Sequence, residues 1–251
     1  MTPAIDPQIL ALIALAGFYA GAQNVLAGGG SFITFPALML AGINPLAANM
    51  TSTIALFPSQ VTSAIAGRSL VGGVGTLSFW RLFWISIVGG AAGAVLLLNT
   101  PVSVFVNLVP WLVLFATVIF AWGSFRRKSV DAPIGMPMWA LALSQFGIAI
   151  YGGYFGGGIG FLMIAALTIA GQSVRMSVAT KNALAAAMNA SAVAIFAFSP
   201  LINWPAAATL AAGGVLGGLS GSWLLHRLPE KLLRGFVVVV GVVLTIWLFV
   251  R

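Results

Sequence analysis

The chain carries the same glycine-punctuated apolar pattern twice, about 129 residues apart. Gly28, Gly29, Phe32, Ala37, Leu38, Ala41, Gly42 and Thr51 recur without a gap as Gly157, Gly158, Phe161, Ala166, Leu167, Ala170, Gly171 and Thr180. A second set, Gly89, Gly90, Gly93 and Pro101, recurs 128 residues later as Gly217, Gly218, Gly221 and Pro229. Duplicated halves with interrupted hydrophobic segments are typical of secondary transporters, which bind their substrates where the two repeats meet.

The composition places this duplication in a lipid bilayer. Hydrophobic residues make up 61% of the 251 residues and charged residues only 6%, too few to cover a soluble globule. Eight apolar runs approach the ~20 residues that a spanning helix requires. They are Ile9–Leu26, Pro45–Ala66, Phe83–Leu98, Val102–Trp122, Trp139–Phe155, Val178–Phe198, Ala206–Leu225 and Leu232–Val250. We therefore expect an all-α polytopic membrane protein with about eight spanning helices, and the first run should remain as a helix because no basic residue precedes Arg68.

Each half also contains one short apolar piece, Phe32–Gly42 or Phe161–Gly171, that follows a glycine triplet. About eleven helical residues cover ~16 Å, roughly half of the hydrocarbon core. These pieces are therefore predicted to be half-helices. A non-helical glycine turn at membrane depth is tolerated only where protein or a watery cavity covers its backbone polar groups. A tight hairpin that packs two helices closely is the simpler interpretation, and it is compatible with the first.

The charge pattern gives the domain organisation and the orientation. Residues 125–137 are the least hydrophobic stretch and contain three consecutive cations, which predicts a cytoplasmic linker between a first repeat, 1–124, and a second repeat, 138–251. The loop at 98–101 is uncharged, whereas its counterpart at 226–231 has an excess of cations. Equivalent loops thus lie on opposite sides, as in two inverted-topology repeats. Both termini are then predicted to lie outside the cell. Arg251 is a minor point against this orientation, because cations favour the cytoplasmic side.

The residue inventory excludes several functions. Asp6, Asp131 and Glu230 are the only acidic residues, all in the N-terminus or in loops, and Cys is absent. No buried carboxylate pair is available for proton relay or hydrolysis, and no ligand cluster is available for a metal, so we expect neither an enzyme nor a cofactor. The net charge of +8 gathers at loops and helix ends, which indicates topology rather than nucleic-acid binding. The glycine turns lack the Gly-Lys-Ser/Thr of a nucleotide loop.

The remaining candidates for chemistry are polar residues at the glycine turns and on the helix that follows each half-helix. Hydroxyls and amides in the first turns of a helix lie where unpaired N–H groups and the helix dipole favour an anion. Gln60 and Asn189 occupy equivalent mid-membrane positions, where an amide is costly unless paired; interhelical hydrogen bonding explains them equally well. The predicted substrate-binding residues are Gln23, Asn24, Gly28, Gly29, Gly30, Ser31, Thr51, Ser52, Gln60, Gly156, Gly157, Gly158, Thr180, Lys181, Asn182 and Asn189.

Lys181 and the later glycines each have two interpretations. Lys181 either snorkels to the cytoplasmic interface or faces the cavity as a cation that attracts an anion, with Arg175 at the same mouth. Gly89 and Gly93 in the first half, and Gly213, Gly217 and Gly221 in the second, are spaced one helical turn apart. This small-xxx-small spacing predicts close helix packing rather than a ligand role.

Several of these motifs resemble the sulfite exporter TauE/SafE family of bacterial membrane transporters. The resemblance rests on the glycine turn followed by Phe-Ile-Thr-Phe-Pro-Ala-Leu, on Ala-Ala-Asn-Met-Thr-Ser-Thr, and on the run from Asn203-Trp204 to Leu233-Arg234-Gly235-Phe236. It covers most of the chain. It implies a multi-pass protein of the bacterial inner membrane that moves sulfite, a sulfonate or another sulfur-containing or organic anion, commonly outward. Gln23, Asn24 and Gln60 are more polar than the family pattern.

Together these observations favour an exporter of a small anion that works by alternating access between the repeats. An anion channel lined by the glycine turns and a non-transporting membrane assembly protein are the alternatives. The expected partners are a small anionic substrate and the lipid bilayer, without nucleic acid. The sequence leaves open whether the chain forms a homo-oligomer.

Overall fold

The computed structural model describes residues 6–26, 29–125, 136–225 and 230–250, and these residues are almost entirely helical. The helices are α1 (Pro7–Leu26), α2 (Ser31–Leu40), α3 (Pro45–Ala66), η1 (Arg68–Leu70), α4 (Phe79–Leu98), α5 (Val102–Phe125), α6 (Met138–Tyr154), α7 (Ile159–Ile169), α8 (Val174–Phe196), α9 (Trp204–Leu225) and α10 (Glu230–Val250). Within these ranges the only strand-like pairing is an isolated bridge between Val74 and Leu77. The all-helical fold class is therefore confirmed.

All eight long apolar runs and both short ones lie on helices, but several helices begin before their apolar run. The difference comes from N-caps, because a polar residue starts the helix ahead of its apolar face. Ser78 accepts a hydrogen bond from the Arg81 N–H and begins α4, four residues ahead of the run at Phe83. Asn44 and Ser173, which are equivalent in the duplication, cap α3 and α8 in the same way.

The two short helices are set by glycines at both ends. Gly29 and Gly158 precede α2 and α7 with φ angles of 91° and 75°, a left-handed conformation that glycine adopts without strain. At the other ends Gly42 and Gly171, with φ angles of 81° and 105°, stop the helices. The N–H group of the residue after each of these glycines donates a hydrogen bond to the carbonyl oxygen five positions earlier, as in a Schellman motif. Glycine placement thus limits α2 to 10 residues and α7 to 11.

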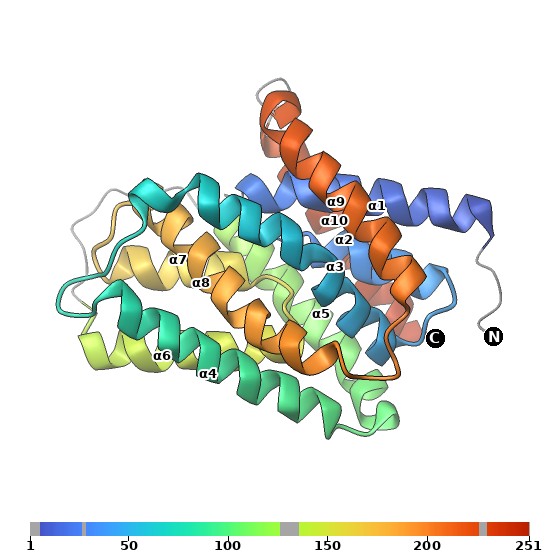
Figure 1. The fold of residues 1–251 in the computed structure, drawn as a ribbon, viewed down its shortest axis with the longest axis horizontal. Coiled ribbons are helices and arrows are strands. Elements are labelled where there is room, and N and C mark those ends of the chain that lie inside the picture. The colour runs from blue at the N-terminus through green and yellow to red at the C-terminus, as the bar shows by residue number, and fades with distance from the viewer. Residues whose placement is uncertain (1–5, 27–28, 126–135, 226–229, 251) are drawn as a thin grey trace.

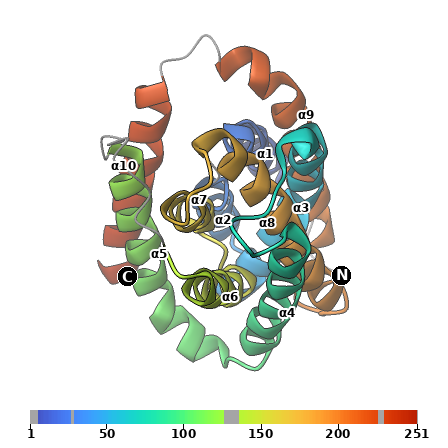
Figure 2. The ribbon, with the colours of Figure 1, turned by 90° about the vertical axis from the view of Figure 1, so that its left-hand side faces the viewer.

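The helices from the two halves of the sequence interleave rather than form separate lobes. In Figure 1, α9 crosses α1 and α4 runs beside α6, and both pairs are in close contact. Helix α3 contacts α8, and each also contacts the fourth helix of the other half, α4 or α9. Figure 2 shows α2 and α7 near the middle, with α5 and α10 paired along one side. The loop at 71–78 and the α7–α8 turn lie at the left-hand end of Figure 1, opposite the start of α1 and the end of α10.

Glycines permit the closest of these contacts. A Cβ atom on Gly21 would collide with the Gly214 carbonyl oxygen, and one on Gly217 with that of Phe18, so α1 and α9 touch through their backbones. Gly89 and Gly93 face α6 in the same manner. The packing interpretation of this glycine series is confirmed for the positions whose surroundings are described, which leaves out Gly221.

The outer surface is strongly apolar. Large exposed side chains, among them Trp84, Trp111, Val118, Leu219 and Val243, point away from the molecule on α4, α5, α9 and α10. In the described residues two helices, Phe79–Leu98 and Val102–Trp122, are long and apolar enough to cross a membrane by length and composition, with mean hydropathies of 1.9 and 2.3. An apolar exterior of this extent fits a lipid-facing surface.

Replacing Gly21 with alanine should destabilise the protein by about 1–3 kcal/mol, because the added methyl group forces α1 and α9 apart. Gly147→Ala is the matched control, since no atom lies within 4 Å of a Cβ there, and it should be neutral or mildly stabilising. The measurement is thermal unfolding of both variants in the same detergent. Equal stability of the two variants would contradict the close backbone contact.

Candidate functional site

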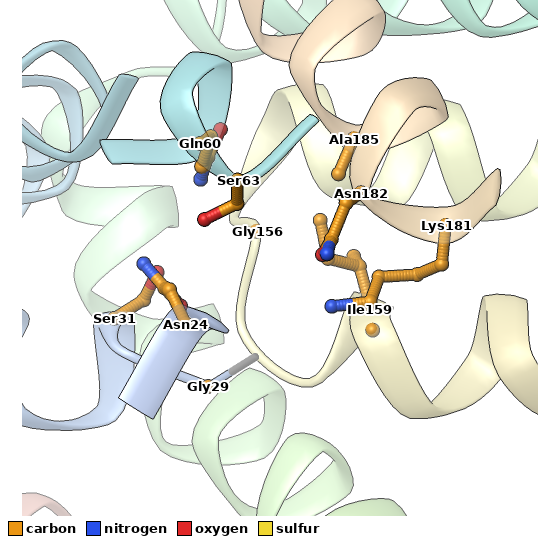
Figure 3. A pocket seen from close by; sticks show the side chains of 11 residues that line it. Asn24, Gly29, Ser31, Gln60, Ser63, Gly156, Ile159, Lys181, Asn182 and Ala185 are labelled. Atoms are coloured by element: carbon orange, nitrogen blue, oxygen red, sulfur yellow. The ribbon is translucent and has the colours of Figure 1, made fainter. Parts of the chain in front are cut away.

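A cavity lies where the two glycine turns meet, between α3 and α8 (Figure 3). Its volume of about 30 Å³ exceeds the space that one water molecule needs. It is lined by Asn24, Gly29, Ser31, Gln60, Ser63, Gly156, Ile159, Gly160, Lys181, Asn182 and Ala185. The first half-helix, the second half-helix, α3 and α8 all contribute residues, so the cavity is built from both halves of the sequence.

Lys181 is the only charged residue of this lining. Its side chain is 3% exposed and extends from α8 with the ammonium group directed into the cavity (Figure 3). None of the described residues forms a hydrogen bond or an ion pair with that ammonium group. A buried cation is costly without a counter-charge, so the geometry leaves a place that an anion would stabilise. Lys181 therefore faces the cavity instead of the interface.

The N-termini of both half-helices also reach the cavity. Ser31 begins α2, Ile159 and Gly160 begin α7, and all three line the site. In the described part of the chain the backbone N–H groups of these residues make no hydrogen bond, and neither helix has a side-chain N-cap. Free N–H groups and two positive dipole ends thus border the same small volume as Lys181.

Three side-chain amides, those of Asn24, Gln60 and Asn182, complete the lining. Gln60 lies on α3, and its Oε1 accepts a hydrogen bond of 2.6 Å from Nδ2 of Asn189 on α8. The Oδ1 of Asn24 accepts one of 3.0 Å from the Gly30 N–H, while its Nδ2 is buried without a partner. Asn24 and Gln60 line the cavity, and Asn189 lies directly behind Gln60.

The non-helical turns are supported by residues of neighbouring helices, α3 and α5. Asn49 on α3 donates a 2.9 Å hydrogen bond to the carbonyl of Tyr154, at the end of α6 just before the second glycine turn. Phe32 and Phe161, which are equivalent in the duplication, both pack edge-on against Phe120 of α5. This aromatic cluster forms an apolar wall beside the glycine turns, and Phe120 lies within 3 Å of where a Gly29 Cβ would be.

The structure brings about half of the candidate residues to the cavity. Asn24, Gly29, Ser31, Gln60, Gly156, Lys181 and Asn182 line it. Gly30 and Asn189 contact lining residues through hydrogen bonds. Gly157 and Gly158 belong to the second glycine turn, with Gly157 beside a small apolar pocket next to α5. Gln23 is buried outside the lining, and Gly28 lies outside the described residues.

Thr51, Ser52 and Thr180 are not brought to the cavity, and each has a structural partner. The Thr51 hydroxyl accepts from the Asn203 N–H, and the Thr180 hydroxyl accepts from the Gly72 N–H. These equivalent threonines therefore fasten the loops that precede α9 and α4. Thr51 is nine residues before Gln60, about two and a half helical turns, so it lies on the opposite face of α3. Ser52 bonds to Thr34 of α2 at 2.6 Å.

Four lining residues were missed by the sequence reasoning, namely Ser63, Ile159, Gly160 and Ala185. Helical spacing would have indicated two of them, because Ser63 follows Gln60 by three residues and Ala185 follows Lys181 by four. Gly160 is the equivalent of Ser31 in the duplication. No signal in the sequence distinguishes Ile159 from the other apolar residues of α7.

The fold and the cavity define a class of protein, an all-helical membrane transporter whose candidate site is enclosed by two broken helices. The sulfite exporter TauE/SafE family model matches residues 13–248, which is nearly the whole chain. The chain belongs to this family, and the protein is a membrane transporter with a small-molecule substrate and a lipid environment.

Curated relatives agree with this class. A "Probable membrane transporter protein" of Haemophilus influenzae is 26% identical over 247 residues, covering 96% of this chain and 94% of the relative. A Sinorhizobium protein, "Probable membrane transporter protein ORF9", is 29% identical, with 95% and 92% covered. "Probable membrane transporter protein YfcA" of Escherichia coli K12 is 27% identical, with 96% and 90% covered. No solved structure matches the chain.

The Gln60–Asn189 hydrogen bond can be measured by a double-mutant cycle. Asn189→Leu should cost about 1–3 kcal/mol, because it leaves the Gln60 carbonyl oxygen without its partner. Replacing both residues with leucine should cost less than the sum of the two single changes. Chemical unfolding in detergent of the two single variants, the double variant and the parent gives the coupling energy. Additive effects would mean that the two amides do not interact.

Proposed function

We propose that this protein exports a small anion across the bacterial inner membrane and that the cavity between the glycine turns is its binding site. The observation that carries the proposal is the buried Lys181 ammonium group, which has no protein counter-charge in the described residues. The lining contains no acidic residue. A bound anion would supply the missing charge through charge-assisted hydrogen bonds.

The donor groups around the cavity support an anion over a neutral solute. An ion entering a narrow site loses its water, and the site must replace those contacts. The ammonium of Lys181, the amides of Asn24 and Gln60, and the free N–H groups of both half-helices offer donors from several directions. Helix N-termini are suited to this role because the dipole adds to the hydrogen bonds.

Inverted repeats and alternating access are supported by the way the helices pair. The helices of the two repeats correspond in order, α1 to α6 and so on to α5 and α10. Under this correspondence the contact between α1 and α9 is equivalent to the contact between α6 and α4, and the contact between α3 and α9 is equivalent to that between α8 and α4. The contacts of α3 with α8 and of α5 with α10 map onto themselves. Gln60 and Asn189 are 129 residues apart, so they are equivalent positions of the two repeats, and they form a hydrogen bond with each other. A residue that touches its own equivalent lies at a pseudo-two-fold axis, as expected for an inverted duplication.

The contents of the two repeats differ around that axis, which supports two interchangeable states. The cavity residues Lys181 and Ala185 correspond to Ser52 and Leu56, and Ser63 corresponds to Ala192. All three counterparts are 3% exposed or less, and none of them lines the cavity. The cavity therefore lies on one side of the axis. Alternating access requires this asymmetry, with the packing exchanged between the repeats.

The proposed outward direction follows from the membrane potential and the residue inventory. With the cell interior negative, moving one monovalent anion outward releases about 2.3 kcal/mol per 100 mV. An exporter of this kind requires no buried coupling carboxylate. The family name makes sulfite the leading substrate, with sulfonates and other sulfur-containing or organic anions next.

Sulfite flux in proteoliposomes tests the function. The parent protein should mediate saturable, potential-driven efflux with counterflow, and Lys181→Gln should raise the half-saturating concentration by about 10- to 100-fold because a hydrogen bond to a charged group is lost. Arg81→Gln, an exposed charge at the start of α4, is the matched control and should change it little. Absence of protein-dependent flux with sulfite and small sulfonates would refute the proposal. Resolvable single-channel currents without counterflow would replace the carrier with a channel.

The proposed orientation is tested with single cysteines in this cysteine-free chain. Asn203→Cys should react with an impermeant thiol reagent added to intact cells, because the α8–α9 loop is proposed to lie outside. Lys128→Cys and His226→Cys should react only after the cells are opened. The readout is labelling of the purified protein, with the unaltered chain as the blank. The reverse pattern would invert the assigned sidedness.

A further inference from the structure

The charge of Lys181 is compensated neither by the protein nor by bulk water in this conformation. Its side chain is 3% exposed and lies at a cavity of about 30 Å³. A cavity of that size has room for about two water molecules. The other polar side chains of the lining are neutral amides and hydroxyls, namely Asn24, Ser31, Gln60, Ser63 and Asn182. They can solvate an ammonium group in part, but they cannot balance its charge.

No acidic residue of the described chain belongs to this site. Asp6 and Glu230 lie at the starts of α1 and α10, and Asp131 lies outside the described residues. The duplication supplies no counter-charge either, because the position equivalent to Lys181 is Ser52, whose hydroxyl is bonded to Thr34 at 2.6 Å. The counter-charge for the ammonium group therefore has to come from the ligand.

This dependence on the ligand bears on the two strokes of a carrier. A carrier that alternates its access passes through a closed state in which the site is sealed from both sides. With an anion bound, the closed site encloses an ion pair with no net charge. Without an anion, it encloses an unpaired ammonium group, and an uncompensated buried charge is strongly destabilising. The empty protein should therefore change between its two states more slowly than the loaded protein.

We propose that the protein is also an anion exchanger, in which a second small anion carried inward pairs with Lys181 and speeds the return stroke. This inference rests on the proposed anion site and concerns the step that returns the protein after release. The returning ligand is a small monovalent anion, because it has to fit the same cavity and balance the same single charge. The empty protein still returns, and its positive charge is drawn inward by the inside-negative potential. Net export thus stays potential-driven, while exchange is not.

Efflux from proteoliposomes measures the two strokes separately. The vesicles are loaded with labelled methanesulfonate, which is monovalent at every working pH, or with labelled sulfite if methanesulfonate is not carried. The outer solution contains either the bulky anion gluconate or excess unlabelled substrate. With the potential held at zero by potassium and valinomycin, efflux into unlabelled substrate should be at least about tenfold faster than efflux into gluconate, because the unpaired charge slows only the empty return. An inside-negative potential should accelerate methanesulfonate efflux into gluconate and leave its exchange nearly unchanged.

Variants at the cavity test whether the charge of Lys181 is the cause. Lys181→Gln, measured at saturating substrate, should abolish the advantage of exchange, because the empty protein then encloses no charge. Lys181→Arg keeps the charge and should keep the advantage. Ala185→Asp places a carboxylate one turn along α8 on the same cavity, where it supplies a permanent counter-charge, so exchange should again be no faster than net efflux. Ala185→Asp decides the matter if Lys181→Gln does not fold.

Arg81→Gln is the matched control, because Arg81 is an exposed cation at the start of α4, outside the cavity lining. It should retain the ratio of exchange to net efflux found in the parent. Equal rates of exchange and net efflux in the parent, or an unchanged ratio in Lys181→Gln, would overturn the exchange proposal while leaving anion transport intact. Stoichiometric proton movement with methanesulfonate would also overturn it, since the amine would then return neutral. Absence of protein-dependent flux under both conditions would instead overturn the proposed function.

Discussion

The structure depends on how two non-helical turns are accommodated inside an apolar molecule. Where a helix breaks within a bilayer, its N–H and C=O groups need partners, because lipid provides none. Asn24 binds the Gly30 N–H at the first turn, and Asn49 binds the Tyr154 carbonyl at the second. Among the turn residues whose N–H groups make no hydrogen bond within the described part of the chain, Ser31, Ile159 and Gly160 line one cavity. The constraint that makes the turns costly thus also produces the candidate site.

Glycine serves two separate purposes in this arrangement. At Gly29 and Gly158 it supplies a left-handed backbone, which ends one helix and starts the next within a few residues. At Gly21 and Gly217 it supplies the absence of a side chain, so that α1 and α9 touch along their backbones. The first purpose creates a site and the second creates a rigid frame around it. Equivalent frames, α1 with α9 and α6 with α4, surround α3 and α8.

The sequence predicted the elements well because each depends on a local signal. The half-helices follow from glycine positions, and the long helices follow from apolar runs near the length of a membrane span. The site was predicted less completely because it depends on which face of each helix meets the cavity. Thr51 and Gln60 share α3 but lie on opposite faces, and only tertiary packing decides which face lines the cavity. Local sequence patterns likewise do not predict that α4 and α9 pack against helices of the opposite half.

The cost of burying a charge explains why one pair of equivalent positions in the two halves holds different residues. A lysine at the position equivalent to Lys181 would bury a second ammonium group, which is costly without a counter-charge. Ser52 occupies that position, and it bonds to Thr34 of the first half-helix at 2.6 Å. A single cation therefore serves a site shared by both repeats, while its neutral counterpart packs tightly. The charge of the cavity thus comes from one repeat alone, and the equivalent position of the other repeat is neutral.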